Sequence, residues 1–335
     1  MPPEGYQLDL ALATTYSMEL TTLLSVPLHL VLHSTEDYKE LLKDPVALYE
    51  SLQRATSKVL VFSQRGGIHA PSGDHLLFGL LEGMIHEVET PGGGVFHPKL
   101  WILRFSDLDS EEIFYRLLIS SKNITSDRAW DMSVTLEGHP GKARQAGNRD
   151  LSKFVRALPK LAVRDQTQLS RTVDAIAADL ERVDWDMPQG YDTLVFHALG
   201  LGGRAWKPPE NDVLTVIAPF LSEAALQTLA RTSSSPIALI SRSDSLPTLA
   251  EPSGFERDYV LHEAAEADEG EDVVEGSLEI GLHAKVYLYE IGRRTHLVIG
   301  SANATNAALL SGRNVELLLE LSGPRRHGRV RDLLD

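Results

Sequence analysis

The sequence predicts an α/β protein built from two similar lobes, and three observations support this fold class. Apolar runs of strand length alternate with helical patterns along the chain, which is typical of α/β proteins. Two segments, 10–24 and 214–229, share the order strand, turn, helix. Each precedes the same polar motif further along, which indicates an internal duplication. We therefore expect two similar lobes related by a pseudo-twofold axis.

The first half contains five apolar runs of strand length that are bounded by turn residues. A helix is expected to begin at Asp44 and Pro45, because Asp caps helix N-termini and Pro is favoured at the first helical position. The expected strands are 8–14, 28–32, 59–62, 100–105 and 114–119.

The second half repeats this alternation, with a helix expected after Ser222. The polar, glycine-bearing segment 138–150 is expected to be a surface connection. An amphipathic helix is expected from Leu169 to Val183, because apolar residues recur there at spacings of three and four. The expected strands are 213–218, 237–240, 285–289, 296–299 and 315–319. The predicted domains are an N-terminal lobe (1–160), a connecting helix (161–190) and a C-terminal lobe (191–335).

The composition excludes several classes of protein. The 335-residue chain has no cysteine, which excludes disulfides, thiolate nucleophiles, Cys-ligated zinc and iron–sulfur clusters. Its net charge of −15 argues against general affinity for nucleic acid, although residues 263–279 alone hold eight acids and are expected to form a solvated loop. No apolar run is long enough to span a membrane and the N-terminus lacks a signal-peptide pattern, so a cytoplasmic location is expected.

A polar motif occurs once in each half. His97 and Lys99 match His283 and Lys285, and they are the only two His-x-Lys pairs in the chain. A Ser-x-Asn pair follows each of them, 26 residues from His97 to Asn123 and 20 residues from His283 to Asn303. The serines are Ser121 and Ser301. In both copies a strand-like run follows the lysine and another ends at the serine, so an adjacent strand can bring the asparagine beside the histidine and lysine.

Two imidazoles, two ammonium groups and two carboxamides suit attack on a phosphodiester. One imidazole can attack phosphorus while the other protonates the leaving oxygen and later activates water. Lysine charges and asparagine amides can stabilise the transition state, which removes the need for a metal ion. Each imidazole also needs a partner for its second nitrogen, and the candidates are Asp131 and Glu316 in later strand-like runs.

At these residues the sequence resembles the phospholipase D superfamily, whose signature is HxK followed by GSxN. Segment 281–310 matches closely, with Glu290 at the acidic position five residues after the lysine. The first copy has Arg104 at that position and Ser120 in place of Gly. Because it lacks the acidic residue, the first copy also looks like the tyrosyl-DNA phosphodiesterase branch. The resemblance implies two lobes, each a mixed sheet flanked by helices, one shared active site and no cofactor or metal. It also implies that His97 is the nucleophile and His283 the general acid.

Three functions are compared. The first is a nuclease acting on DNA or RNA, in bacterial defence or DNA processing. The second is a phospholipid hydrolase or phosphatidyl transferase, which would favour an amphipathic docking surface that the sequence does not show. The third is a catalytically silent nucleic-acid-binding scaffold, which the retention of all six core residues argues against. The nuclease is preferred, with no membrane partner, and the net acidity leads to the hypothesis that a protein partner subunit assists substrate binding.

Overall fold

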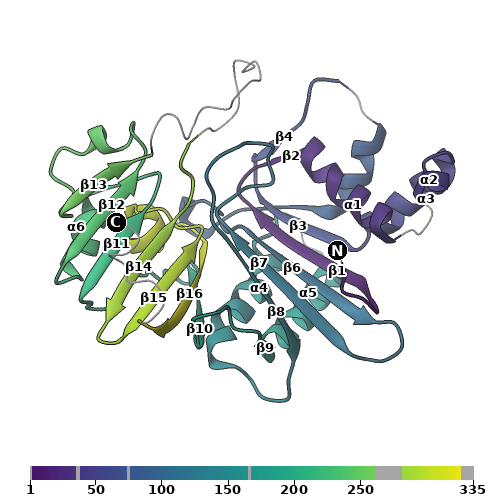
Figure 1. Cartoon of the computed structure of the whole chain (residues 1–335). Helices are drawn as coiled ribbons and strands as arrows, with labels where there is room; N and C mark the ends of the chain where they lie inside the picture. The colour runs from purple at the N-terminus through teal and green to yellow at the C-terminus, as the bar shows by residue number, and fades with distance from the viewer. Residues whose placement is uncertain (1, 35–37, 74–75, 165–166, 262–280, 326–335) are drawn as a thin grey trace.

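The computed structural model describes residues 2–34, 38–73, 76–164, 167–261 and 281–325. The acidic run 263–279 lies outside the described residues. Figure 1 shows two separate sheets, with the N-terminal lobe on the right and the C-terminal lobe on the left.

The N-terminal lobe contains a seven-stranded mixed sheet in the order β5-β3-β1-β6-β7-β8-β9. β3 pairs in parallel with both β1 and β5, whereas the pairs from β1 to β9 across the rest of the sheet are antiparallel. The strands are β1 (Tyr6–Thr15), β3 (Val59–Gln64), β5 (Ile85–Val88), β6 (Leu100–Asp107), β7 (Ile113–Ser120), β8 (Ser133–Pro140) and β9 (Val183–Trp185). Two short strands, β2 (Met18–Glu19) and β4 (Ile68–His69), form a separate ribbon.

The C-terminal lobe contains a second seven-stranded sheet, in the order β10-β16-β15-β14-β11-β12-β13. Read from the β13 edge, the second sheet has the same strand order and pairing as the first. β13, β12 and β11 correspond to β5, β3 and β1, and β14, β15 and β16 correspond to β6, β7 and β8. The strands are β10 (Thr193–Leu199), β11 (Val213–Ile217), β12 (Pro236–Ser241), β13 (Arg257–Val260), β14 (Val286–Ile291), β15 (Arg294–Gly300) and β16 (Glu316–Pro324). The predicted fold class, two similar lobes each with a mixed sheet, is confirmed.

Helices cover the outer faces of the sheets and fill the space between them. One core joins α4 and α5 to residues of both sheets, for example Ile102 of the first and Leu317 of the second, so that the lobes share a hydrophobic interior. The outer face of the first sheet packs on α1 and η1, and that of the second packs on α6 and η5. The helices are α1 (Leu20–Ser34), α2 (Tyr38–Leu41), α3 (Pro45–Thr56), α4 (Arg149–Leu161), α5 (Thr167–Leu180) and α6 (Glu223–Arg231), with the 3-10 helix η1 (Leu76–Met84) and the π-helix η5 (Asn306–Leu310). Among the described ranges, every helix is too short or too polar to cross a lipid bilayer.

Three sequence predictions of local structure are wrong. Segment 138–150 is not simply a surface connection, because residues 138–140 complete β8, α4 begins at Arg149, and Asn148 and Asp150 are buried. Segment 28–32 is not a strand but part of α1, because a five-residue apolar run cannot by itself separate a strand from a buried turn of helix. The helix predicted to reach Val183 ends at Leu180, and Val183 begins β9 at the edge of the first sheet. The predicted cap at Asp44 is confirmed: its carboxylate accepts hydrogen bonds from the backbone N–H groups of Val46 and Ala47, both at 3.1 Å.

Candidate active site

Both copies of the motif lie at the edges where the two sheets face each other. The His-x-Lys segments are extended and lead directly into β6 and β14, and the Ser-x-Asn segments follow β7 and β15. β6–β7 and β14–β15 are antiparallel pairs, so the start of one strand lies beside the end of the next. The backbone N–H of Ser120 accordingly donates to the carbonyl of Lys99 at 3.1 Å. Each hairpin therefore brings its own histidine, lysine and asparagine to one edge.

Backbone hydrogen bonds join the two edges reciprocally. The N–H of His97 donates to the carbonyl of Val315 at 2.9 Å, and the N–H of His283 donates to the carbonyl of Trp130 at 2.9 Å. Val315 and Trp130 directly precede Glu316 and Asp131, the two carboxylates singled out in the sequence. The bridge between the lobes therefore also sets the position of both acidic side chains.

Each imidazole is held by a carboxylate from the opposite lobe. His97 Nδ1 lies 3.0 Å from Oε2 of Glu316, and His283 Nδ1 lies 2.8 Å from Oδ1 of Asp131. A carboxylate at Nδ1 favours the tautomer that donates there, which leaves the lone pair of a neutral ring on Nε2. The sequence indicated the carboxylates but not that they cross between lobes.

The two motif serines fix these carboxylates. Ser121 Oγ donates to Oδ1 of Asp131 at 2.7 Å, and Ser301 Oγ donates to Oε2 of Glu316. Each serine hydroxyl also accepts the backbone N–H of the residue that follows the carboxylate, Met132 at 3.0 Å and Leu317 at 3.1 Å. The serines thus act on the histidines through the acids, as positioning groups.

The two motif lysines are buried cations within the same cluster. Lys99 is 2% exposed and Lys285 is fully buried. Lys99 Nζ donates to the carbonyl of His97 at 2.8 Å, and Lys285 Nζ donates to the carbonyl of His283. Two ammonium groups and two carboxylates balance one another, so the charges of the lysines and acids in the cluster largely cancel.

The motif asparagines keep their amides available. Asn123 and Asn303 lie two residues after the positioning serines, and the Oδ1 atom of each has no hydrogen-bond partner among the described residues. Their Oδ1 atoms are buried. A buried carbonyl oxygen without a protein partner is costly, and it calls for a hydrogen-bond donor from a ligand or from water.

Burial controls protonation in the cluster. Desolvation lowers the pKa of His97 to about 4, and the attraction of Glu316 only partly opposes it. Desolvation also lowers the pKa of His283, with Lys285 acting in the same direction and Asp131 against it. Burial alone would raise the pKa of Asp131 and of Glu316, but hydrogen bonds and charge from their partner histidines outweigh it and hold both below the usual range. Lys99 and Lys285 each act on both histidines, so the two motifs form one electrostatic unit.

The position that is acidic in the phospholipase D signature lies outside the cluster. Arg104 bonds to Asp9 and lies 3.7 Å from Asp179, and buried Glu290 forms an ion pair with Arg325 at 2.7 Å. Both positions are five residues into the hairpin strands, away from the edge with the histidines. Their difference between the copies therefore bears on packing rather than on the chemistry of the site.

Tyr16 was not singled out in the sequence, yet it lies against the site. Its ring centroid is 5.4 Å from that of His97 in an edge-on arrangement, and Lys99 Nζ lies 5.9 Å from the same centroid. Tyr16 directly follows β1, which pairs with β6 so that Thr14 lies opposite Leu100. The signal that could have found it is its place at the carboxyl end of the first strand.

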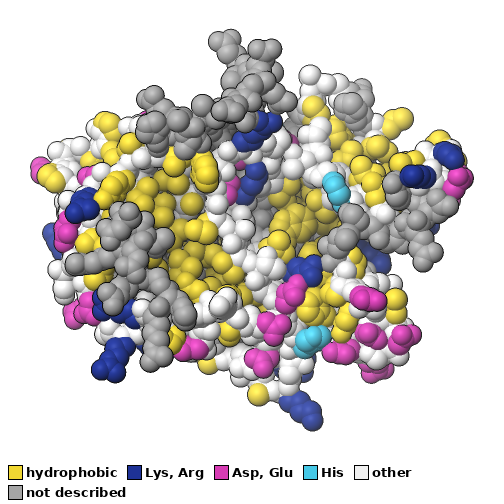
Figure 2. Space-filling model, in the orientation of Figure 1, with side chains coloured by type: hydrophobic (Ala, Val, Ile, Leu, Met, Phe, Trp, Pro, Cys, Tyr) yellow, Lys and Arg dark blue, Asp and Glu magenta, His cyan; other side chains and the backbone are white. Residues whose placement is uncertain are grey.

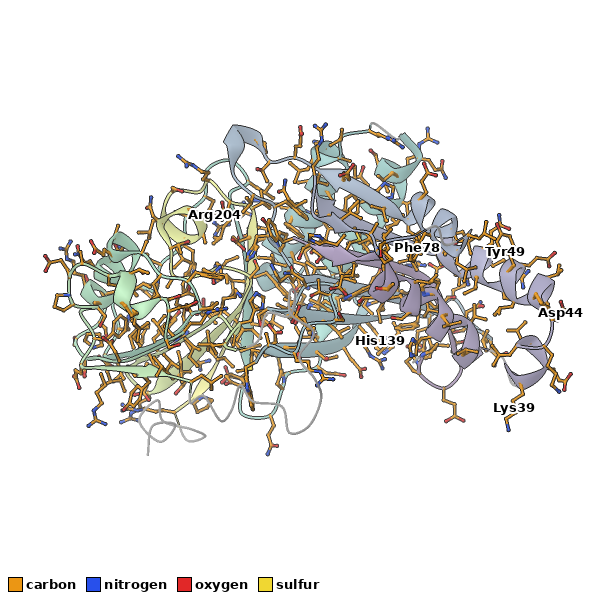
Figure 3. The ribbon with its side chains drawn as sticks, turned by 90° about the horizontal axis from the view of Figure 1, so that it is seen from above. Lys39, Asp44, Tyr49, Phe78, His139 and Arg204 are labelled. Atoms are coloured by element: carbon orange, nitrogen blue, oxygen red, sulfur yellow. The ribbon has the colours of Figure 1, made fainter. Side chains whose placement is uncertain are left out.

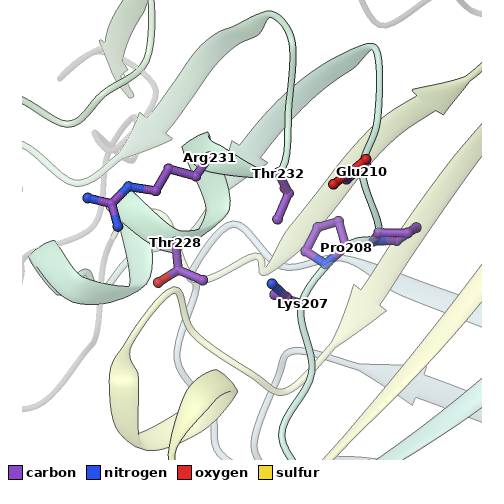
Figure 4. A pocket seen from close by; sticks show the side chains of 7 residues that line it. Lys207, Pro208, Glu210, Thr228, Arg231 and Thr232 are labelled. Carbon is purple, nitrogen blue, oxygen red and sulfur yellow. The ribbon is translucent and has the colours of Figure 1, made fainter.

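The described residues also contain a pocket that lies apart from this cluster. No group of three or more His, Asp or Glu side chains there is arranged to hold a metal ion. A pocket of about 470 Å³ is lined by residues that include Lys207, Glu210 and Arg231 (Figure 4). It lies at the beginning of β11, the end opposite to the motif, and includes none of the cluster residues.

Comparison with known proteins shows the fold. No family model and no curated protein matches the sequence. Among solved structures, yeast tyrosyl-DNA phosphodiesterase matches with a TM-score of 0.51 and 11% identity, over 98% of this chain and 85% of that one. A mutant form of the same yeast protein matches with a TM-score of 0.52 and 11% identity, over 94% of this chain and 82% of that one. The likeness thus extends over both lobes.

Proposed function

We propose that the protein is a phosphodiesterase of the phospholipase D type that cleaves DNA or RNA through a phosphohistidine intermediate. The observation that carries the proposal is the crossed pair of imidazole–carboxylate contacts, with a buried lysine in each motif. The fold shared with yeast tyrosyl-DNA phosphodiesterase supports DNA as the substrate class.

The proposed reaction has two steps, and His97 is the nucleophile. Because its pKa is lowered to about 4, His97 is neutral near pH 7 and its Nε2 can attack phosphorus. As the P–N bond forms, the bond from phosphorus to the leaving oxygen breaks and protonated His283 gives that oxygen its proton. In the second step neutral His283 takes a proton from water, whose oxygen attacks phosphorus and releases His97.

Lysine and asparagine side chains complete the proposed mechanism. Lys99 and Lys285 face the negative charge that builds up on the non-bridging oxygens, and the amides of Asn123 and Asn303 donate to the same oxygens. Fixed donors of this kind need no reorganisation when the charge develops. They are proposed to supply the stabilisation that metal ions give in other phosphoryl-transfer enzymes.

The cellular role and the partner are proposed from the expected activity and from the charge of the chain. A cytoplasmic role in bacterial defence or DNA processing rests on the predicted nuclease activity. A partner subunit that contributes positive charge is proposed because the net charge of −15 disfavours long contacts with a phosphate backbone.

The function is tested with a panel of substrates in excess EDTA. Single-stranded DNA, duplex DNA, RNA, phosphatidylcholine vesicles and methyl p-nitrophenyl phosphate are incubated with the purified protein, and products are separated by electrophoresis or chromatography. We expect cleavage of nucleic acid and of the small diester with chelator present. Loss of all activity in EDTA, or hydrolysis of the vesicles alone, would contradict the proposal.

The pH dependence of kcat/KM should show two limbs on the acidic side of neutrality. Activity needs neutral His97, so it should rise through about pH 4. Activity also needs protonated His283, whose pKa lies below 6.5, so it should fall before neutrality is reached. The measurement is a pH–rate profile on an oligonucleotide, whose alkoxide leaving group needs the proton.

A matched substrate separates the two limbs. Methyl p-nitrophenyl phosphate releases a stable phenolate that needs little protonation, so its profile should keep the rising limb and lose most of the falling one. Identical falling limbs for the two substrates would contradict the assignment of His283 as the general acid.

A further inference from the structure

In each lobe an exposed aromatic residue lies next to the segment that follows the motif asparagine. Tyr16 is 37% exposed and lies two residues before Met18, which bridges to Ile124, the neighbour of Asn123. In the other lobe Phe220 is 43% exposed and directly precedes Leu221, which bridges to Ala304, the neighbour of Asn303. The two rings therefore stand near the loops that carry the motif asparagines, one in each lobe, on the rim of the proposed active site.

Both rings are held by a neighbouring cation. Lys99 Nζ lies 5.9 Å from the centroid of Tyr16, and the guanidinium carbon of Arg242 lies 5.8 Å from that of Phe220. Arg242 is itself fixed by two hydrogen bonds of 3.0 Å to Asp244. Rings that are positioned in this way and still exposed are pre-organised to stack on a flat, neutral partner.

The charge of the protein makes such stacking useful. On the face drawn in Figure 2 the visible Lys and Arg side chains of the described residues are scattered, whereas Asp and Glu gather along its lower part. Binding of a phosphate backbone by charge alone would then be weak. Stacking of bases on aromatic side chains adds affinity without regard to sequence, and it requires bases whose faces are free.

We propose that Tyr16 and Phe220 stack on unpaired bases on the two sides of the scissile phosphate, so that the preferred substrate is a single-stranded polynucleotide. This inference rests on the proposed function. A duplex does not fit, because its bases already stack on one another. A choline headgroup does not fit either, because the cations beside both rings repel a quaternary ammonium group.

The experiment measures binding apart from chemistry. Fluorescence anisotropy gives the Kd of three ligands with cleavage-resistant phosphorothioate linkages: a short single-stranded oligodeoxynucleotide, the same backbone with tetrahydrofuran abasic residues, and the duplex. Wild type is compared with Tyr16→Leu, Tyr16→Phe and Phe220→Leu. The control is Tyr49→Leu, which removes a 46% exposed ring from α3, a helix that carries no residue of the motif (Figure 3).

We expect wild type to bind the base-containing strand roughly tenfold more tightly than the abasic strand or the duplex. Tyr16→Leu and Phe220→Leu should each lose much of the preference for the base-containing strand. Tyr16→Phe, which keeps the ring, and the control Tyr49→Leu should retain this preference. Three outcomes would overturn the inference. Wild type could bind the base-containing and abasic strands equally, or it could bind the duplex more tightly than the single strand. The preference for the base-containing strand could also be unchanged in both leucine variants.

Two further measurements separate this inference from the proposed function. Hydrolysis of methyl p-nitrophenyl phosphate, which has no base, reports the chemistry alone. A protein that stacks bases but does not hydrolyse this diester would contradict the phosphodiesterase and leave the stacking intact. Phosphatidylcholine vesicles that bind wild type but not Tyr16→Leu would assign the rings to a lipid headgroup and overturn the inference.

Discussion

Replacing His97 with alanine is expected to lower kcat/KM for oligonucleotide cleavage roughly 10⁴-fold, because the reaction then loses its nucleophile. His283→Ala should cause a similar loss on the same substrate, because the alkoxide leaving group then departs without a proton. The control is His139→Ala, which removes a histidine that is 48% exposed on β8, outside the cluster (Figure 3). Steady-state rates, with circular dichroism to show that each variant is folded, provide the measurement.

The two histidine variants should differ on an activated substrate. With methyl p-nitrophenyl phosphate, His283→Ala can still form the P–N bond because the phenolate leaves unaided, but it lacks the base that activates water. We expect a burst of one p-nitrophenolate per protein and accumulation of the phosphohistidine. His97→Ala should show no burst. Peptide mapping after alkaline quench should place the phosphoryl group on the peptide with residue 97, and its recovery on residue 283 would reverse the two roles.

The fold was largely predictable because the duplicated motif marks both lobes. Each His-x-Lys precedes a strand and each Ser-x-Asn follows one, so the hairpins β6–β7 and β14–β15 could be placed from sequence order. The strand predicted at 28–32 was wrong because it rested on local composition alone. This segment lies inside α1, and so short an apolar run shows no periodicity that separates a helix from a strand.

The contacts between the lobes were not predictable from one sequence. His97 and Glu316 are 219 positions apart, and His283 and Asp131 are 152 apart. Which carboxylate meets which imidazole depends on how α4 and α5 pack the two sheets together, and hydrophobic packing leaves no residue-specific mark in the motif. Tyr16 was missed for a related reason, since no second tyrosine occupies the equivalent place to draw attention to it.

Removing the crossed carboxylates should lower activity about 100-fold each, because the imidazole loses the group that fixes its tautomer and orientation. The substitutions are Asp131→Asn and Glu316→Gln, which preserve side-chain volume where Glu316 is fully buried and the Asp131 side chain is 13% exposed. The crossed arrangement predicts which histidine each of them perturbs. Asp131→Asn should lower the pKa of His283, and Glu316→Gln should lower that of His97, because each carboxylate stabilises the imidazolium of its partner.

NMR titration of the imidazole resonances across the acidic pH range distinguishes two arrangements. In one, each carboxylate contacts the histidine of the opposite lobe; in the other, each contacts the histidine of its own lobe. In Asp131→Asn the titration of His283 should move to lower pH while that of His97 stays in place, and Glu316→Gln should act only on His97. Double variants give the same information through rates: adding Asp131→Asn to His283→Ala should cost little further activity, since the acid acts through that ring. If Asp131→Asn moved His97 instead, each histidine would be oriented within its own lobe. The activity would then not depend on the reciprocal bridge through Val315 and Trp130.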